Sequence, residues 1–198
     1  YYNDGYVRKR AVNSHGLDLA CDHNHAFMYM EVIASDQGTT YSALDYEINQ
    51  DFDQLEKTEL GLRAVDKVCA RIGAAPVKSG TYPVILENST AASLLSAHMS
   101  IFSAEAAQKG MSLLKDKEGT AIASEVLSIV DNPLLVNGLA SAPFDGEGVP
   151  CRHKHIIRNG TLETLLHNLK TAHKAGVSTT GNASRSGYKG TIGVSHSN

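Results

Sequence analysis

Two carboxylates stand close together in a glycine-rich segment, residues 143–150, that could line a cleft. Asp145 and Glu147 alternate there with Gly146 and Gly148. Paired carboxyl groups are residue types that general acid–base catalysis uses. The alternative is that both side chains accept backbone N–H bonds and fix the loop, since alternating glycines indicate a sharp turn or the close approach of another group. The sequence leaves both roles open, and under either one the loop is a candidate part of a substrate cleft.

Two His-x-His pairs are further candidates, because imidazole nitrogens are common metal ligands. His153 and His155 fall on an expected strand, where residues two apart point to the same face. His23 and His25 fall in an expected turn. Solvent-facing histidines without a metal are the alternative for both pairs. The sequence does not decide whether the fold brings the two pairs together.

A helix expected from residue 88 or 89 to Lys109, closed by Gly110, carries one more histidine. His98 lies on its apolar stripe, and Glu105 follows seven residues later on roughly the same helix face. One imidazole and one carboxylate do not make a zinc site. We therefore expect His98 to be a partly buried, hydrogen-bonded residue of the stripe, which also contains Leu94, Leu95, Ile101 and Phe102.

Asn182 completes the set of candidate cleft residues, at the end of the run Ser178-Thr179-Thr180-Gly181-Asn182. The glycine-rich stretch that follows lacks the Gly-Lys-Ser/Thr end of a phosphate-binding loop. No Gly-x-Ser-x-Gly elbow indicates a serine hydrolase. Cys151 has no accompanying motif that would mark it as a nucleophile. We assign no catalytic residue and no metal ligand from these patterns.

The cysteines and the hydropathy narrow the class of protein. Three cysteines stand at wide spacings without a Cys-x-x-Cys pair, so free thiols in a reducing cytoplasm are expected. No stretch is apolar enough to span a bilayer, and we recognise no secretory signal. The chain starts at Tyr1 without an initiator Met, so we expect its natural start to lie upstream.

The charge is uneven along the chain, although the formal net charge is only -3. Residues 151–198 contain seven Lys and Arg against the single acid Glu163, a formal charge of +6. This basic end could attract a phosphate, an acidic partner or a peptide carboxylate, or it could pair with the acidic part of the same protein. The acidic balance of residues 1–150, together with the absence of Trp, argues against a nucleic-acid binder.

The first part of the chain reads as a β meander followed by a helix. Short apolar runs separated by turn-rich breaks predict strands over 7–12, 17–21, 27–33 and 39–46, with turns at 13–16, 22–25 and 35–38. Apolar residues three and four apart predict a helix over 58–72, with Thr58 as its N-cap and Gly73 past its end. The linker-like stretch 73–80 places a domain boundary there, so we expect domains at 1–79 and 80–198.

The second part reads as mixed α and β structure. Strands are expected over 81–87 and 121–130, and a hairpin of 153–157 with 161–166 is expected around Asn159-Gly160, whose residue types suit a type I′ turn. A short helix is expected over 169–175, ended by Gly176. The Gly- and Ser-rich tail, 181–198, is expected to be ordered only where something covers it. The predicted fold class is α+β, an antiparallel sheet with a packed helix followed by a mixed domain.

The order and spacing of several short strings closely resemble the TldD/PmbA family of peptide-cleaving and peptide-maturing proteins. These strings are 143–150, Asn159-Gly160 and 178–182, supported by 13–16, 112–116 and 138–141. Each string is ordinary by itself, and their shared order makes the match specific. The resemblance is strongest over 81–182, and it implies the α+β fold of that family's middle and C-terminal domains.

One motif of the family is missing. Catalytic members carry a His-Glu-x-x-x-His zinc motif on the helix that corresponds to 88–109. Aligning Leu94 and Leu95 with the apolar pair before that motif puts Ser96 and Ile101 at the histidine positions and Ala97 at the glutamate position. The chain therefore resembles the PmbA (TldE) branch, which lacks the metal motif and pairs with TldD in a heterodimeric peptidase.

The resemblance implies a cytoplasmic, non-catalytic subunit that helps to process small or unfolded peptides. Zinc is then expected only in a TldD-like partner, with no cofactor, nucleic acid or membrane bound by this chain. An older family label, modulator of DNA gyrase, does not require DNA binding. Two alternatives remain open: an autonomous metallopeptidase with unorthodox ligands among His98, Glu105, His153 and His155, and a non-enzymatic peptide-binding or regulatory homodimer. Full-length members of the family are more than twice this length.

Overall fold

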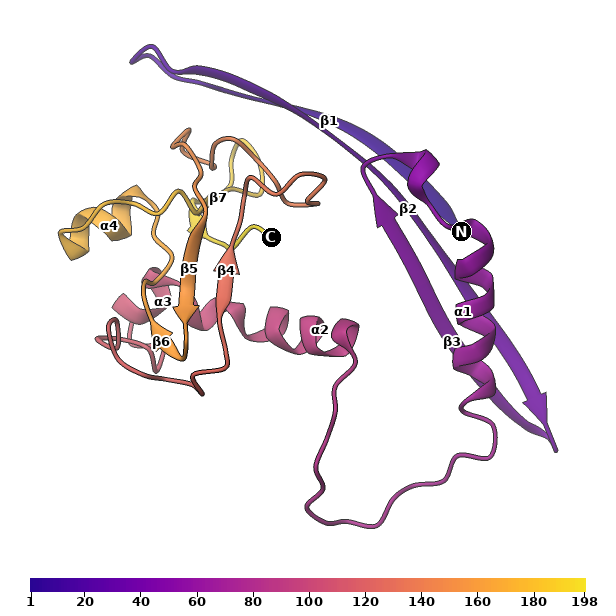
Figure 1. Ribbon diagram of the computed structural model, residues 1–198. Coiled ribbons are helices and arrows are strands. Elements are labelled where there is room, and N and C mark those ends of the chain that lie inside the picture. Colours follow the sequence, from indigo (N-terminus) through magenta and orange to yellow (C-terminus); the bar gives the residue numbers. More distant parts are fainter. The chain divides into compact units, whose positions relative to one another are not determined.

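The computed structural model describes all 198 residues. The chain forms two compact units (Figure 1). Unit 1 contains Tyr1–Lys9 and Asp22–Val84, and unit 2 contains Arg10–Cys21 and Ile85–Asn198. The first hairpin is thus divided: its tip, Arg10–Cys21, belongs to unit 2, while the residues before and after the tip belong to unit 1. None of the helices combines the length and the apolar composition needed to cross a bilayer.

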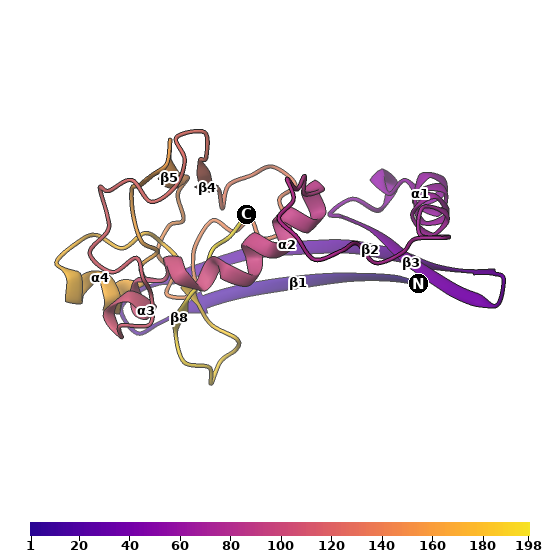
Figure 2. The same cartoon turned by 90° about the horizontal axis from the view of Figure 1, so that it is seen from below.

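The N-terminal sheet is the antiparallel meander that the sequence predicts, but it has three strands in the order β1-β2-β3 instead of the four that were expected. Its strands are β1 (Tyr2–Val12), β2 (Asp18–Asp36) and β3 (Thr39–Asn49). Figure 2 shows β1 and β2 running side by side as a long ribbon. Gln37 and Gly38 join β2 to β3 with φ of 46° and 81°. Positive φ at both positions is what a two-residue type I′ hairpin requires.

The predicted turn at 22–25 is wrong, because β2 runs through it without a break. Asp22 and Asn24 are exposed there, while His23 and His25 are half-buried. This alternation is the period of a strand whose two faces differ in exposure. The polar composition suggested a turn, but the sheet accepts polar side chains on its exposed face, where Asp22 lies 3.6 Å from Arg8.

Helix α1 (Lys57–Cys69) follows the short 3-10 helix η1 (Phe52–Gln54) and packs on β3. Its buried residues, Leu60, Ala64 and Val68, are spaced by four and share one face. The predicted N-cap is wrong, since the helix begins at Lys57 without a side-chain cap. The N–H of Glu56 instead donates to the Glu47 carboxylate at 2.6 Å, which fixes the helix start from β3.

Residues 81–87, predicted as a strand, form none. The segment contains three consecutive apolar residues, 84–86, but none of its backbone groups pairs with another strand. A strand exists only as part of a ladder, so favourable residue types alone were not sufficient.

The predicted helix over 88–109 is broken into three pieces: α2 (Asn88–His98), the 3-10 helix η2 (Met99–Phe102) and α3 (Ala104–Gln108). Ser103 is extended, with φ of -72° and ψ of 123°, and caps α3 by accepting from the N–H of Ala106. The N–H of Ala104 donates to the carbonyl of Leu166 at 2.9 Å. The backbone at Ala104 thus pairs with Leu166 instead of continuing the helix.

The second sheet has the order β4-β5-β6, from β4 (Ile129–Asp131), β5 (Lys154–Arg158) and β6 (Thr161–Leu162). The hairpin around Asn159-Gly160 is confirmed, with φ of 45° and 78° at the two turn residues. The predicted strand over 121–130 is largely wrong, since only residues from Ile129 onward form a strand. Ala121 makes a single bridge to Thr161. The N–H groups of Ile122 and Ala123 donate to the carbonyl of Gly160, and a turn from Ser124 to Leu127 follows.

Helix α4 (Leu169–Ala175) has the bounds predicted from the sequence, and Gly176 follows it with φ of 70°. Asn168 and Thr171 form a capping box at its start. The tail is ordered by pairing of β7 (Ala183–Ser184) with β8 (Gly193–Val194).

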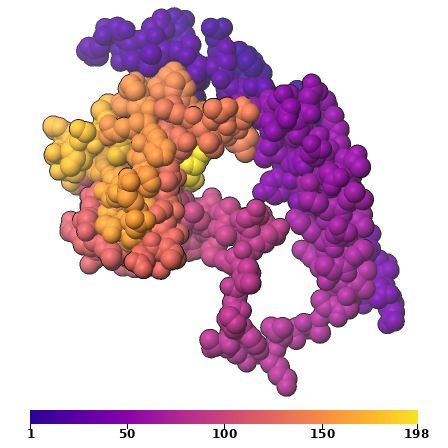
Figure 3. Space-filling model, viewed as in Figure 1, coloured from indigo at the N-terminus to yellow at the C-terminus, as the bar shows by residue number.

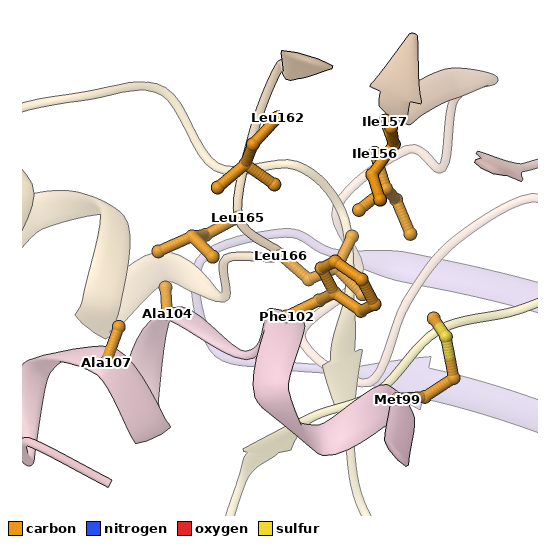
Figure 4. Close-up of a cluster of buried hydrophobic side chains, with 9 residues drawn as sticks. All are labelled: Met99, Phe102, Ala104, Ala107, Ile156, Ile157, Leu162, Leu165 and Leu166. Carbon is orange, nitrogen blue, oxygen red and sulfur yellow. The ribbon is translucent and has the colours of Figure 1, made fainter. Parts of the chain in front are cut away.

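The hydrophobic core of unit 2 lies between η2, α3 and the β5–β6 hairpin (Figure 4). Ile156, Leu162 and Leu166 are at most 1% exposed. The other members of the cluster are Met99, Phe102, Ala104, Ala107, Ile157 and Leu165. The α+β class is confirmed, and this core fixes the strands and turns that carry the polar groups described next.

Candidate functional site

Asp145 is buried, and its carboxylate accepts three hydrogen bonds from backbone N–H groups. Its Oδ1 accepts from the N–H groups of Glu147 and Val149 at 2.9 and 3.0 Å. Its Oδ2 accepts from the N–H of Ala183 at 2.9 Å. The N–H of Gly146 donates in return to the carbonyl of Ala183 at 2.8 Å. The geometry is that of a loop-fixing carboxylate, which joins 145–149 to β7.

Glu147 does not face Asp145 as an acid–base partner. Its Oε2 accepts from the N–H of Leu169 at 2.8 Å, at the first residue of α4. A carboxylate at this position also meets the positive end of the helix dipole. The two carboxylates of the loop therefore attach it to two different elements, β7 and α4.

Asn182 is buried at the crossing of three segments. Its Nδ2 donates to Asp131 Oδ2 at 2.8 Å and to the carbonyl of Ser195 at 2.9 Å. Its backbone N–H donates to the carbonyl of His167 at 3.3 Å. Its Oδ1 is buried without a hydrogen-bond partner. The side chain thus joins β4 to the tail, and the backbone N–H adds the segment before α4.

Asp131, which the sequence analysis missed, is the most enclosed acid of the chain at 1% exposed. Besides Asn182, it accepts from Lys154 Nζ at 2.7 Å and from the N–H and Oγ of Ser197, each at 2.6 Å. Burial acts to raise the pKa of Asp131, but the hydrogen bonds from Asn182, Lys154 and Ser197 outweigh it and lower the pKa below the usual value. The group is therefore an ionised carboxylate with a buried cation beside it.

His167 is a second buried group that the sequence analysis missed. Its backbone N–H donates to Thr180 Oγ1 at 2.6 Å, and its carbonyl accepts from Thr179 Oγ1 at 3.1 Å. Burial lowers the pKa of His167 below the usual value, against the opposing charge of Glu118. Its Nδ1 is buried without a hydrogen-bond partner. The imidazole is consequently neutral near pH 7 and serves as part of the interior.

We refer to these groups together as the polar junction: Asp131, Asp145, Lys154, His167 and Asn182. Its centre is the chain from 179 to 183. Gly181 there has φ of 70°, and a Cβ on it would lie 2.9 Å from the carbonyl oxygen of Pro150. Only glycine fits that conformation and that contact. The two carboxylates, the Lys154 ammonium and the Asn182 Nδ2 all bind other parts of the chain, so the observable role of the junction is to hold these segments together.

His98 and Glu105 lie outside the polar junction. His98 is exposed, so the expected partial burial is wrong, because α2 buries none of its residues. The expected hydrogen bond is present, between Nδ1 and the carbonyl of Leu94 at 2.8 Å. Glu105 pairs with Lys109 at 2.8 Å, and that ammonium lowers the pKa of the carboxyl. Each side chain is thus occupied within its own helical segment.

His153 and His155 are close together but nearly perpendicular, with ring centroids 5.6 Å apart and planes at 78°. His155 lies on β5, and its Nδ1 is 2.9 Å from Nη2 of Arg158. The guanidinium at Nδ1 leaves only Nε2 of this ring as a possible metal ligand. His23 and His25 lie on β2 with ring centroids 6.5 Å apart. No three side chains of His, Cys, Asp and Glu gather as a metal-binding group.

The helix that corresponds to the zinc motif does not fit a zinc ion. Ser96 and Ala97 lie near the end of α2, while Ile101 lies on η2 after the helix has ended at His98. Hydroxyl, methyl and butyl groups supply none of the imidazole, thiolate or carboxylate ligands that zinc takes from proteins.

Residues far apart in sequence make up the polar junction, which explains why it was missed. Asp131 follows the apolar pair 129–130, and His167 follows the apolar pair 165–166. A polar residue directly after an apolar pair was the available signal, because such a residue, where it is buried, must find hydrogen-bond partners.

Comparison with known proteins agrees with the fold. Residues 1–72 match the family described as PmbA/TldA metallopeptidase central domain, and residues 79–198 match its C-terminal domain. A PmbA metalloprotease homologue of Haemophilus influenzae is 30% identical over 172 residues, which cover 86% of this chain and 38% of that protein.

Two solved structures are similar. A Thermotoga maritima protein described as a modulator of a DNA gyrase has a TM-score of 0.88 at 38% identity, over 98% of this chain and 44% of its own. TldE of Thermococcus kodakarensis has a TM-score of 0.86 at 27% identity, over 99% of this chain and 45% of its own. The chain spans about two fifths of the length of these relatives. With both domain matches in sequence order, the chain belongs to the PmbA/TldD family of metallopeptidase-like proteins.

Proposed function

We propose that this chain is part of a PmbA (TldE)-like subunit of a cytoplasmic, two-subunit peptidase that degrades or matures small or unfolded peptides. In this proposal the subunit is itself non-catalytic. Zinc and the zinc-bound chemistry belong to a TldD-like partner, and this chain shapes part of the peptide cavity. It binds neither nucleic acid nor a membrane.

The observation that carries the proposal is the chemistry of the helix at 94–101. Family members that hold zinc need two imidazoles and a carboxylate there. This chain places Ser96 and Ala97 on α2 and Ile101 on η2, separated by the end of the helix. No rotation of these side chains supplies a ligand, so the site of catalysis in the proposed complex lies on the partner.

The hydrogen bonds of the two loop carboxylates also support a non-catalytic role for this chain. Asp145 accepts three backbone N–H groups, and Glu147 accepts one at the start of α4. A general base must reach the group whose proton it takes, whereas these carboxylates are turned to backbone groups of their own chain. Carboxylates bound in this way are suited to hold a loop in shape, which is what the wall of a cavity requires.

The autonomous metallopeptidase is the weaker alternative. Its ligands would come from among His98, Glu105, His153 and His155. Three of them have other partners. His98 bonds to the carbonyl of Leu94, and Glu105 pairs with Lys109. His155 contacts Arg158. These contacts leave only Nε2 of these two histidine rings as a possible metal ligand, and no three side chains of His, Cys, Asp and Glu gather around one point. A peptide-binding homodimer is the remaining alternative.

The test is co-expression of the chain with a TldD-like subunit, followed by light scattering and a peptide-cleavage assay. We expect a 1:1 complex that cleaves an unfolded peptide, while this chain alone cleaves none. The matched control replaces Ser96 by Ala, which should leave both complex and activity unchanged. A homodimer that does not mix with the TldD-like subunit would support the regulatory alternative, and cleavage by the chain alone would contradict the proposal.

A further inference from the structure

The last two residues of the tail are bonded to the segment that follows β4. The N–H and the Oγ of Ser197 both donate to Asp131 Oδ1, each at 2.6 Å. The N–H of Asn132 donates to the carbonyl of Asn198 at 3.0 Å. Figure 3 shows the yellow atoms of this end lying beside orange atoms of unit 2. Two segments that are 66 residues apart in sequence are thus joined through backbone and side chains together.

The carboxamide of Asn198 is bound by three groups of the 132–141 loop. Its Oδ1 accepts from the N–H of Ala140 at 2.9 Å. Its Nδ2 donates to the carbonyl of Asn132 at 2.9 Å and to Ser141 Oγ at 2.8 Å. A primary carboxamide offers two N–H donors and one acceptor oxygen. Both donors and the oxygen of Asn198 are therefore engaged by this one loop.

The polarity of the three loop groups is fixed, which makes the site selective. The hydroxyl of Ser141 donates its only proton to the carbonyl of Leu135 at 2.7 Å, so toward Asn198 it can only accept. A backbone carbonyl likewise only accepts, and the N–H of Ala140 only donates. Two acceptors and one donor are the complement of a carboxamide. A carboxylate of the same shape would turn an oxygen toward both acceptors, and Ser141 could donate to it only by giving up Leu135.

Gly138 forms the floor under this carboxamide. A Cβ on Gly138 would lie 2.7 Å from Nδ2 and 2.9 Å from Cγ of Asn198. The φ of Gly138 is not in the left-handed region, so the backbone conformation alone does not require glycine there. The close approach of the amide does require it, because any larger residue would displace the Asn198 side chain.

The loop is shaped by hydrogen bonds of its own. The N–H of Gly138 donates to the carbonyl of Leu135 at 3.1 Å, and the N–H of Ser141 donates to the carbonyl of Gly138 at 3.1 Å. The N–H of Ala142 donates to the carbonyl of Pro133 at 2.9 Å and closes the loop. These bonds do not involve the tail. The three groups that bind Asn198 are thus arranged in advance, as a binding site requires.

We propose that the 132–141 loop is a binding site for a primary carboxamide, and that Asn198 fills it as a latch that ties the tail to the loop. Ser197 is the second residue of the latch, because Asp131 accepts from both its N–H and its hydroxyl. The site takes asparagine and rejects the isosteric aspartate. Since Asp131 also belongs to the polar junction, the latch connects that junction to the loop.

The test is amide hydrogen exchange of the whole chain at pH 7, followed residue by residue by NMR. In Asn198→Asp the N–H of Ala140 should exchange at least about tenfold faster, because three hydrogen bonds are disturbed and each contributes about a two- to tenfold factor. The N–H of Leu166, bonded to the carbonyl of Phe102 in the core, is the internal reference and should keep its rate. An unchanged rate at Ala140, or equal acceleration at Leu166, would overturn the proposal.

The matched control is Asn137→Asp, the same chemical change in the same loop. The side chain of Asn137 is exposed and does not bind the tail, so the rate at Ala140 should stay unchanged. Equal acceleration in both variants would show that added charge, and not loss of the carboxamide, opens the loop.

A double-mutant comparison tests the contact itself. Ser141→Ala should speed exchange at Ala140 in the unmodified chain, because Nδ2 of Asn198 loses an acceptor. With Asn198→Ala already present, the same change should alter that rate by less than about twofold, since residues in contact are not additive. Fully additive effects would contradict the latch. Neither measurement involves a TldD-like subunit, so the result is independent of the proposed function.

Discussion

Asn182 and Asp131 are 51 residues apart in sequence, and the amide Nδ2 of the first donates to the carboxylate Oδ2 of the second at 2.8 Å. Both side chains are buried, at 5% and 1% exposed. The same carboxylate accepts from Lys154 and Ser197. One ionised group thus joins β4, β5, the 179–183 segment and the C-terminal residues. We expect this group to govern the stability of unit 2.

Replacing Asp131 by Asn should destabilise unit 2 by about 3–5 kcal/mol, because it leaves a buried ammonium without its counter-charge. The side chain of Lys154 is only 9% exposed, so water cannot take the place of the carboxylate. Urea unfolding followed by near-ultraviolet circular dichroism measures the change. As a control, Glu163→Gln removes an ion pair to Arg158 that is 52% and 37% exposed, and should cost less than about 1 kcal/mol. Equal costs for the two variants would contradict a central role for Asp131.

Two glycines with the same φ should respond differently to alanine. Gly181 and Gly176 both have φ of 70°. A Cβ at Gly181 would lie 2.9 Å from the carbonyl oxygen of Pro150, while nothing lies within 4 Å of one at Gly176. Gly176→Ala should cost about 1–2 kcal/mol from the left-handed backbone alone. Gly181→Ala should cost clearly more in the same unfolding assay, and similar costs would mean that the 150–181 contact is not formed.

Asp145→Asn tests the loop that carries the paired carboxylates. The substitution turns one acceptor oxygen into a donor that faces a backbone N–H, which leaves buried donors unsatisfied at about 1–3 kcal/mol each. Glu147→Gln changes a single, half-buried contact and should cost about 1 kcal/mol or less. Thermal unfolding of the two variants compares them directly. A larger loss in Glu147→Gln would reverse the roles assigned to these carboxylates.

His167 predicts how stability depends on pH. Its pKa is lowered in the folded chain, so between that value and 6.5 the unfolded chain binds the additional proton. The contribution of His167 is therefore fully present above about pH 6.5 and is lost as the pH falls below it. Asp131 acts in a separate pH range. Because its pKa is lowered in the folded chain, its contribution to the free energy of unfolding is complete above about pH 3.8 and is lost as the pH falls below that value.

Melting temperatures between pH 8 and pH 5 check the histidine window. We expect His167→Gln to flatten the decrease in melting temperature between pH 6.5 and pH 5. The control variant His153→Gln changes an exposed ring and should retain the slope of the unmodified chain. A slope unchanged in His167→Gln would show that this group does not titrate as described.

Local chemistry was the part of the fold that the sequence could predict. The Asn159-Gly160 turn and the helix 169–175 are fixed by residues next to one another, and both are confirmed. The strand at 81–87 and the continuous helix at 88–109 depended on partners elsewhere. The first has no partner strand, and the second is broken where Ala104 pairs with Leu166.

The candidate site shows the same limit. Asp145, Glu147 and Asn182 were noticed from spacing and composition, but their partners Ala183, Leu169 and Asp131 are far away in sequence. Asp131 and His167 look like ordinary polar residues until the sheet encloses them. Burial and distant pairing are properties of the folded chain, so single-residue patterns could not reveal them.

The most direct test of the central claim is the zinc content of the purified chain, measured by elemental analysis alone and after co-expression with a TldD-like subunit. The account predicts no stoichiometric zinc in the chain alone and one zinc per pair in the complex, because Ser96, Ala97 and Ile101 supply no ligands. One tightly held zinc per chain in the lone protein would contradict it, and would make the histidines at 98, 153 and 155 the first residues to replace.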